Sequence, residues 1–263
     1  MKEFKKISKA SVIIFIFLAL CCFGCTKKTR HNELILGTNA SYPPYESVNA
    51  QGELEGFDID VAQAIAKKLN KKLVIKDMSF DALILGLNQE KFDMIMGGIS
   101  ITPSREKEII MVPYQGEVMK AFVLVFWGSV PVQIKSISDV KDYQNKTIAV
   151  QAGTIMEEYM RKFPDVISKP LESTSELIMD IKHQKSAAVL LEPHIARDIA
   201  RKHGNLGQLE IPLPPAEWVK GNGIGIRKNN LKLLQQIQNA IDALKREGVI
   251  QDLEKKWLKG KGA

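Results

Sequence analysis

The chain has 263 residues, of which 45% are hydrophobic and 25% are charged, and this ordinary globular composition excludes collagen-like, mucin-like and wholly disordered proteins. The net charge of +7 comes from 37 basic and 30 acidic residues. The basic residues are scattered and not clustered with aromatic residues, so no nucleic-acid partner is expected. All 3 cysteines lie within the first 25 residues, which excludes a disulfide framework and a thiolate metal site from the rest of the chain.

The N-terminal segment has the pattern of an export signal. Lysines precede an apolar run over residues 12–23, which is too short for a membrane span because a helix needs about 20 residues to cross a bilayer core. The run ends at Gly24-Cys25, and a small residue directly before a cysteine resembles a bacterial lipoprotein signal. We therefore expect a signal peptide at 1–24, a lipidated (palmitate-carrying) Cys25 and a tether at 25–33. The alternative is an uncleaved anchor, and both interpretations place the body outside the cytoplasm.

From residue 34 onward, strand patterns alternate with helix patterns. Leu34 to Leu36 is a short apolar run ended by Gly37 and predicts a strand, whereas the two prolines within 42–45 predict a loop. Residues 57–69 predict an amphipathic helix. Further strands are expected at 73–75, 93–96, 122–126, 147–150, 187–191 and 224–226, and further helices near 83–87, 157–163, 173–185 and 229–247. This order predicts α/β layers with mostly parallel sheets.

Several helix ends are marked by capping residues. Thr102 followed by Pro103 predicts a helix start, because threonine caps free N–H groups and proline fits the first helical position. Ser173 and Glu176 have the spacing of a capping box. The glycines around Asn222 predict a turn at 221–223, and Gly248 is expected to end the helix at 229–247.

Groups suited to an amino-acid ligand follow the strand ends, where ligands bind in open α/β sheets. A helix start next to Arg105 suits a carboxylate, because it combines oriented N–H groups with a guanidinium fork. Glu192, after another apolar strand, suits a cation. Together they match the carboxylate and ammonium of a free α-amino acid. Each residue alone also has an ordinary structural interpretation, such as a solvated surface arginine or a helix-start carboxylate.

Longer motifs resemble those of a known family. The segments 37–45, 56–61 (Gly-Phe-Asp-Ile-Asp-Val) and 97–105 (Gly-Gly-Ile-Ser-Ile-Thr-Pro-Ser-Arg) are similar to motifs of the family 3 bacterial extracellular solute-binding proteins, the polar amino-acid receptors of ABC importers. The resemblance covers residues 34–258 and is strongest to arginine-binding lipoproteins. It implies a periplasmic-binding-protein-like α/β fold of two lobes with central sheets, joined by two crossing strands. Lobe one would hold 34–118 plus 213–263, and lobe two would hold 119–212.

The resemblance also implies how the charges act. Arg105 would bind the ligand carboxylate, with help from the Ser100 and Thr154 regions and backbone N–H groups. Glu192 would bind the α-ammonium together with the Gly98 carbonyl and the Ser100 hydroxyl. Glu192 departs from the commoner aspartate of the family by one methylene.

The side-chain end of the ligand would meet two aromatic rings. Tyr42 and Phe80 would sandwich a planar guanidinium, and Asn39 would face its far end. Relatives that bind lysine or ornithine often carry an acid in place of Asn39, and Ile155 replaces a common hydroxyl, so only its backbone can serve. The full expected set is Asn39, Tyr42, Phe80, Gly97, Gly98, Ser100, Arg105, Gly153, Thr154, Ile155 and Glu192.

The resemblance implies a monomeric receptor, without cofactor or metal, on the periplasmic or extracellular face of a membrane. It would deliver L-arginine to an ABC permease, with glutamine or another polar amino acid as the alternative ligand. An exported dehydratase-like enzyme and a surface adhesin or sensor are rival functions on the same fold. Catalysis needs a general acid or base in the pocket. The four histidines, His31, His183, His194 and His203, are expected outside the cleft, so a binding protein is favoured over an enzyme.

Overall fold

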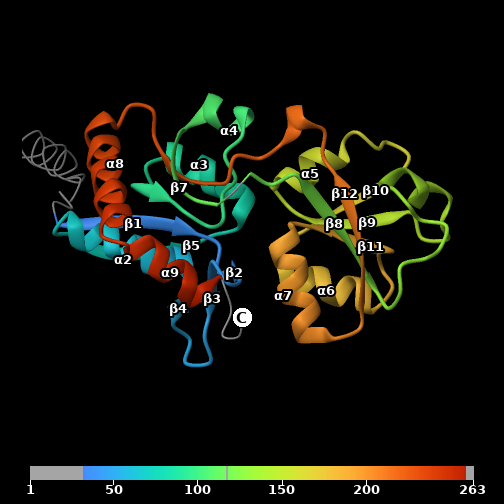
Figure 1. Ribbon diagram of the computed structural model, residues 1–263. Coiled ribbons are helices and arrows are strands. Elements are labelled where there is room, and N and C mark those ends of the chain that lie inside the picture. The colour runs from blue at the N-terminus through green and yellow to red at the C-terminus, as the bar shows by residue number, and fades with distance from the viewer. Residues whose placement is uncertain (1–31, 117, 259–263) are drawn as a thin grey trace, which may run out of the picture. The chain divides into compact units, whose positions relative to one another are not determined.

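The computed structural model describes residues 32–116 and 118–258. The predicted signal peptide, Cys25 and nearly all of the predicted tether lie outside the described residues. One compact unit spans Glu33–Ala263, and it contains two five-stranded sheets, each flanked by helices (Figure 1). No helix among the described residues is both long enough and apolar enough to cross a membrane.

The first sheet has the strand order β5-β1-β6-β13-β7. Its strands are β1 (Glu33–Thr38), β5 (Lys72–Asp77), β6 (Met94–Ile95), β7 (Ile110–Gln115) and β13 (Asn222–Ile226). β1 pairs in parallel with β5 and β6, whereas β13 runs antiparallel to β6 and β7. Sequence-distant β13 therefore joins the two halves of this sheet.

Helices cover both faces of the first sheet. They are α2 (Phe57–Lys68), η1 (Phe80–Ala82), α3 (Leu83–Asn88), α4 (Pro103–Glu108), α8 (Leu231–Arg246) and α9 (Val249–Trp257). Because side chains alternate along a strand, Leu34 and Leu36 belong to the cluster packed on α2 and α8, whereas Ile35 belongs to the cluster around α3. The helices α2, α8 and α9 pack against one another (Figure 1). Gly248, with φ 77°, ends α8, and α9 follows it directly.

The second sheet has the order β10-β9-β11-β8-β12. Its elements are β8 (Ala121–Trp127), η2 (Ile137–Asp142), β9 (Thr147–Gln151), α5 (Ile155–Met160), β10 (Ile167–Leu171), α6 (Thr174–Lys182), β11 (Ala188–Leu191), α7 (Pro193–His203) and β12 (Leu206–Pro212). β9 is parallel to β10 and β11, and β8 is antiparallel to β11 and β12. Phe122 and Leu124 pack in a cluster with α5, while Val123 and Val125, on the alternate face, pack in a cluster with α6 and α7.

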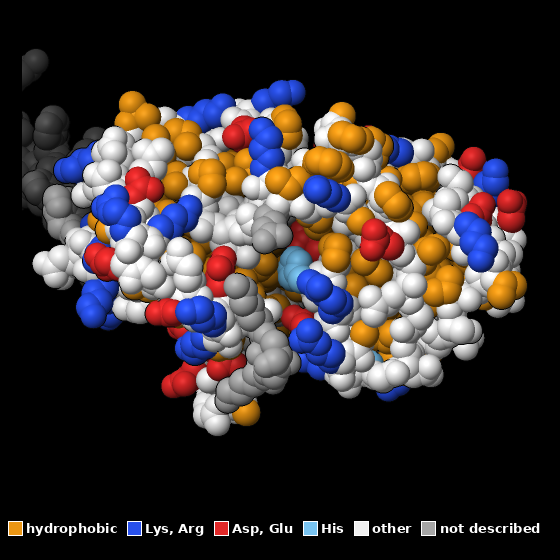
Figure 2. Space-filling view, viewed as in Figure 1, with side chains coloured by type: hydrophobic (Ala, Val, Ile, Leu, Met, Phe, Trp, Pro, Cys, Tyr) orange, Lys and Arg blue, Asp and Glu red, His pale blue; other side chains and the backbone are white. Residues whose placement is uncertain are grey.

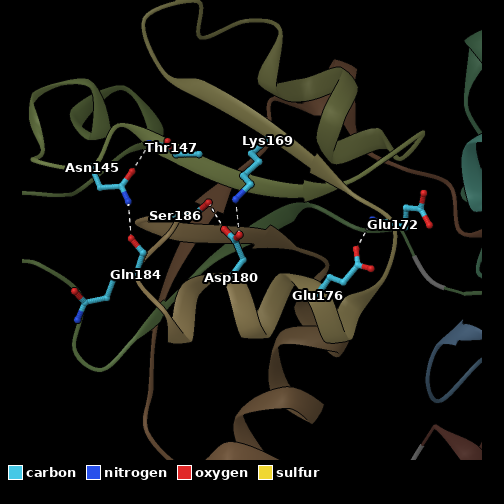
Figure 3. Close-up of polar contacts among 8 residues, drawn as sticks. All are labelled: Asn145, Thr147, Lys169, Glu172, Glu176, Asp180, Gln184 and Ser186. Carbon is cyan, nitrogen blue, oxygen red and sulfur yellow. Dashed lines mark hydrogen bonds and ion pairs between the residues drawn. The ribbon is translucent and has the colours of Figure 1, made fainter.

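Buried polar contacts tie α6 to the second sheet (Figure 3). The Asp180 carboxylate accepts hydrogen bonds from Lys169 Nζ and Ser186 Oγ, each at 2.5 Å. At the start of α6, Ser173 Oγ accepts from the Glu176 N–H. The Glu176 carboxylate does not close the expected capping box, because it accepts from the Glu172 N–H at 3.0 Å. This contact fixes the peptide that follows β10.

The chain passes between the two sheets twice, after β7 and after β12. The two passages are joined by reciprocal backbone hydrogen bonds between Met119 and Val219, at 2.9 and 3.1 Å. A short third sheet of β2 (Ser41–Tyr42), β3 (Glu46–Val48) and β4 (Leu54–Glu55) is antiparallel. The two lobes with central sheets agree with the expected fold class.

Some details of the sequence prediction are wrong. Both five-stranded sheets are mixed: β13 and β8 each run antiparallel to both of their neighbours, while the other four strands of each sheet run in one direction, as expected. The turn expected at 221–223 lies partly inside β13, where an irregularity falls between Asn222 and Gly223. The helix expected near 157–163 runs from Ile155 to Met160, because Thr154 caps it through its hydroxyl.

Charged side chains are mixed on the face of the molecule in Figure 2. Lys and Arg side chains there alternate with Asp, Glu and apolar side chains. This face therefore lacks the continuous basic surface that nucleic-acid binding uses.

Gly56 and Gly52 give a matched test of local packing. A Cβ on Gly56 (φ 137°) would lie 2.2 Å from the Tyr45 carbonyl oxygen, whereas one on Gly52 (φ 81°) would meet nothing within 4 Å. We expect Gly52→Ala to cost about 1–2 kcal/mol through backbone conformation alone, and Gly56→Ala to cost at least about 2 kcal/mol more through the added clash. Urea unfolding of both variants measures this difference, and equal costs would contradict it.

Candidate functional site

A cavity between the two sheets collects most of the expected ligand-binding residues. Its lining consists of Tyr42, Phe80, Gly97, Gly98, Ser100, Arg105, Gln151, Thr154, Ile155, Met156 and Glu192. Of the expected set, Asn39 and Gly153 are not in this lining, but each contacts a lining residue. Asn39 Oδ1 accepts a hydrogen bond from Gln151, and the Gly153 carbonyl accepts one from Arg105.

Arg105 is held at the first turn of α4. Thr102 Oγ1 accepts from the Arg105 N–H at 3.2 Å, which confirms the predicted cap. The guanidinium donates to the Ser100 carbonyl at 2.8 Å and to the Gly153 carbonyl at 3.2 Å, and its Cζ lies 5.4 Å from the centre of the Phe80 ring. Burial lowers the pKa of Arg105 to about 10, against the attraction of nearby carboxylates. The side chain is thus a buried cation at neutral pH.

Glu192 is the acidic counterpart on the other lobe. It is 4% exposed and directly precedes Pro193, which starts α7. Its Oε2 accepts from the Tyr42 hydroxyl at 2.9 Å, and its Oε1 accepts from Ser100 Oγ at 3.2 Å. Burial, and then the charge of Glu192, raise the pKa of Tyr42 well above its ordinary value. Tyr42 therefore stays a neutral hydrogen-bond donor.

One histidine lies next to Glu192 without belonging to the cavity lining. His194 Nε2 is 3.4 Å from Glu192 Oε2, and the imidazole packs edge-on against Tyr45 at 5.3 Å. His194 is the second residue of α7, and this position at the helix start keeps its side chain close to Glu192. His183 and His203 stand at helix ends, and His31 is outside the described residues.

The Gly97-Gly98 segment is held by Asp58. Asp58 Oδ2 accepts from the Gly98 N–H at 2.8 Å, and its Oδ1 accepts from the Tyr114 hydroxyl at 2.5 Å. Gly98 has φ 58°, and a Cβ there would lie 3.1 Å from the Tyr42 ring. Burial raises the pKa of Asp58 to about 6, although both hydrogen bonds oppose the shift. The motif at 56–61 thus positions a wall of the cavity.

A second buried carboxyl group stands behind the same segment. Glu46 is 0% exposed, and neither of its oxygens has a hydrogen-bond partner among the described residues. Burial, and then the neighbouring Asp58, raise its pKa well above the ordinary value. Burial behind Gly97 therefore favours the neutral form of this acid.

Two lining residues were missed by the sequence analysis. Gln151 is the last residue of β9, and Met156 is in the first turn of α5. The rule that ligands bind beyond strand ends could have found Gln151, whereas nothing in the local sequence distinguishes Met156 from a core residue. In the part of the chain that the structure describes, no group of three or more His, Cys, Asp and Glu is placed to hold a metal ion.

The sequence and the fold define a class of protein. Residues 34–260 match the bacterial extracellular solute-binding proteins, family 3, and the chain belongs to this family. It is 40% identical over 245 residues to a probable ABC transporter arginine-binding protein, ArtJ, of Chlamydia trachomatis, covering 92% of this chain and 93% of that protein.

Solved structures agree with this assignment. A Salmonella typhimurium periplasmic binding protein, described as highly specific for arginine, superposes with a TM-score of 0.79 at 28% identity, covering 86% of this chain and 99% of that one. An ancestral arginine-binding protein bound to glutamine gives a TM-score of 0.76 at 29% identity, covering 87% and 99%. The cavity thus lies in a fold shared with amino-acid-binding proteins.

The raised pKa of Asp58 gives a test by pH. Between pH 3.8 and about 6 the folded protein keeps a proton on Asp58 that the unfolded chain has lost, so stability falls as pH rises through this window. We expect the unfolding free energy of the wild type to fall by on the order of 3 kcal/mol more than that of Asp58→Asn between pH 4 and pH 7. Comparing the two proteins removes only the part of the Glu46 contribution that does not depend on the Asp58 charge, and parallel pH profiles would contradict the prediction.

Proposed function

We propose that this protein is an extracytoplasmic receptor that binds a free amino acid, L-arginine most tightly, and delivers it to an ABC permease. The observation that carries the proposal is the double contact of Ser100. Its carbonyl accepts from Arg105, and its hydroxyl donates to Glu192. A buried cation and a buried anion therefore contact the same residue, Ser100, and this places them close enough for one α-amino acid to reach both with its carboxylate and its ammonium.

The chemistry of both groups suits this ligand. Arg105 offers a planar donor fork for a carboxylate, and Glu192 offers two acceptor oxygens for an ammonium. Binding would exchange the present bonds of Arg105 and Glu192 for bonds to the ligand. Each charge-assisted hydrogen bond contributes about 1.5–3 kcal/mol.

Two aromatic rings of the cavity and two similar proteins favour arginine as the ligand. The guanidinium of Arg105 already lies over Phe80, and Phe80 and Tyr42 line the same cavity, so a flat cationic side chain has aromatic surfaces on which to pack. The Chlamydia trachomatis and Salmonella typhimurium relatives are both described as arginine binders. Glutamine is the alternative, since one similar structure holds it.

Lobe closure is the proposed mechanism, with lobe one at 34–118 plus 213–263 and lobe two at 119–212. It is supported by close contacts across the cavity, where a Cβ on Gly153 would lie 2.6 Å from Asp81 Cα. A ligand drives closure only through its higher affinity for the closed form. A shift from 1:99 to 99:1 needs about 5.5 kcal/mol, which two charged clamps can supply.

We propose that Cys25 anchors the receptor as a lipoprotein on the periplasmic or extracellular face, beside its permease, and that it acts as a monomer. The support is the pattern of residues 12–25 and membership of an extracellular solute-binding family. Metabolic labelling with a palmitate analogue, compared between wild type and Cys25→Ala, tests the anchor. Equal labelling of the two proteins would overturn it.

A dehydratase-like enzyme is the alternative that one contact supports. His194 and Glu192, 3.4 Å apart, have the proximity expected of an acid–base pair. Incubation with chorismate-like acids separates the two functions. A binding protein leaves these acids unchanged, whereas an enzyme converts them.

The ligand assignment predicts the order of the stabilising effects in a thermal-shift screen of the twenty amino acids. L-arginine at 100 times its dissociation constant should raise the unfolding free energy by about 2.7 kcal/mol. Lysine, ornithine and glutamine, tested separately at the same concentration, should give smaller shifts. If calorimetry finds that glutamine binds tenfold more tightly than arginine, glutamine and not arginine is the ligand.

The role of Arg105 predicts a large loss of affinity on truncation. Removing one side of a buried charge pair costs roughly 2–5 kcal/mol, so Arg105→Ala should weaken L-arginine binding by about 30-fold or more. Arg105→Lys should recover little, because an ammonium lacks the two-pronged geometry. Titration with radiolabelled arginine measures both. Near-wild-type affinity in Arg105→Ala would show that Arg105, although buried, does not hold the ligand carboxylate.

A further inference from the structure

The side-chain amide of Gln151 is fixed from two directions. Gln151 is 3% exposed and lines the cavity. Its Nε2 donates to Asn39 Oδ1 and to the Glu172 carbonyl, both at 3.2 Å. An amide nitrogen has two hydrogens, so both donors of Gln151 are already used.

The orientation of the amide follows from backbone groups that can only accept. The Met78 carbonyl oxygen accepts a hydrogen bond from Asn39 Nδ2 at 3.0 Å. This bond orients the Asn39 amide so that its Oδ1 faces Gln151. The Glu172 carbonyl independently requires a donor from Gln151. The backbone of Glu172 is also tethered on its other side, because the Glu172 N–H donates to the Glu176 carboxylate at the start of α6 (Figure 3). Flipping either amide would therefore set an oxygen against a carbonyl oxygen.

This arrangement leaves one polar atom of Gln151 for the cavity. With Nε2 occupied, the remaining polar atom is the carbonyl oxygen Oε1, and the hydrogen bonds among the described residues include none to it. We propose that Gln151 Oε1 accepts a hydrogen bond from the side-chain terminus of the ligand, and so selects ligands by that terminus. The proposal rests on the proposed function, in which Arg105 and Glu192 hold the other end of an amino acid.

An oriented acceptor discriminates by chemistry. A guanidinium, an ammonium or an amide nitrogen can donate to Gln151 Oε1, whereas a carboxylate cannot and an alkyl chain leaves the oxygen unpaired. Asn39 acts through Gln151 as a positioning residue, since its Oδ1 accepts from Ser41 and Gln151 and its Nδ2 donates to the Met78 carbonyl. In this proposal Gln151, and not the expected Asn39, makes the contact with the far end of the ligand.

The experiment compares two ligands that share both charged α-groups. Competition against radiolabelled L-arginine gives the affinities of L-arginine and L-norleucine, which has an unbranched alkyl chain. Gln151→Met keeps a similar volume without the acceptor, and should lower the arginine-to-norleucine affinity ratio about tenfold or more. The exposed Gln208 of β12 provides the matched control, Gln208→Met, which should leave the ratio unchanged.

A second variant tests positioning. Asn39→Ala should lower the same ratio in the wild-type background but leave it unchanged in the Gln151→Met background, which a purely structural role would not do. Norleucine binding and the thermal midpoint show whether each variant is folded. An unchanged ratio in folded Gln151→Met overturns the inference. Failure of the wild type to bind L-arginine instead overturns the proposed function, and it appears before any variant is compared.

Discussion

The cationic Arg105 and the anionic Glu192 must both stay buried beside one cavity without forming a direct ion pair. In water-poor surroundings Arg105 and Glu192 would attract strongly, and a direct ion pair would occupy the place of a ligand. Ser100 satisfies both, with its carbonyl on the guanidinium and its hydroxyl on the carboxylate. Most neighbouring features serve this separation. Gly153 supplies a second carbonyl to Arg105, and Tyr42 supplies a second donor to Glu192.

The position of Ser100 is in turn set by residues well away from the cavity centre. The Gly97-Gly98 segment before it is held by Asp58, at the start of α2, and Gly56 allows α2 to begin directly against the Tyr45 carbonyl. A bridge to Asn222 then aligns Ser100 with β13. A sequence motif outside the cavity lining thus determines where groups of the lining lie.

The sequence predicts the elements best where one local force dominates. The strand at Leu34 to Leu36 and the helix start at Thr102 follow from hydrophobic patterning and from capping, and both are observed. The second sheet's edge strands β10 and β12 were missed, because they are only partly buried and their polar residues hide the strand pattern. The reversed direction of β8 and β13 was also missed, because local patterning does not specify the pairing partner.

The site was predictable as a set of residues but not as a network. Strand ends and family motifs brought together residues such as Arg105 and Glu192. The link from Asn39 to Gln151 joins residues 112 positions apart, and the contact of His194 with Glu192 depends on how α7 starts. Such contacts depend on tertiary packing, which composition and spacing do not encode.

The strand order has a consequence for the order in which the two lobes can fold during synthesis or export. β13 lies between β6 and β7, so the first sheet lacks an interior strand until residue 226 is available. All strands of the second sheet have been made by residue 212. During synthesis or export, the lobe in the middle of the chain can therefore complete its sheet first, while the lobe that begins the chain waits for its end.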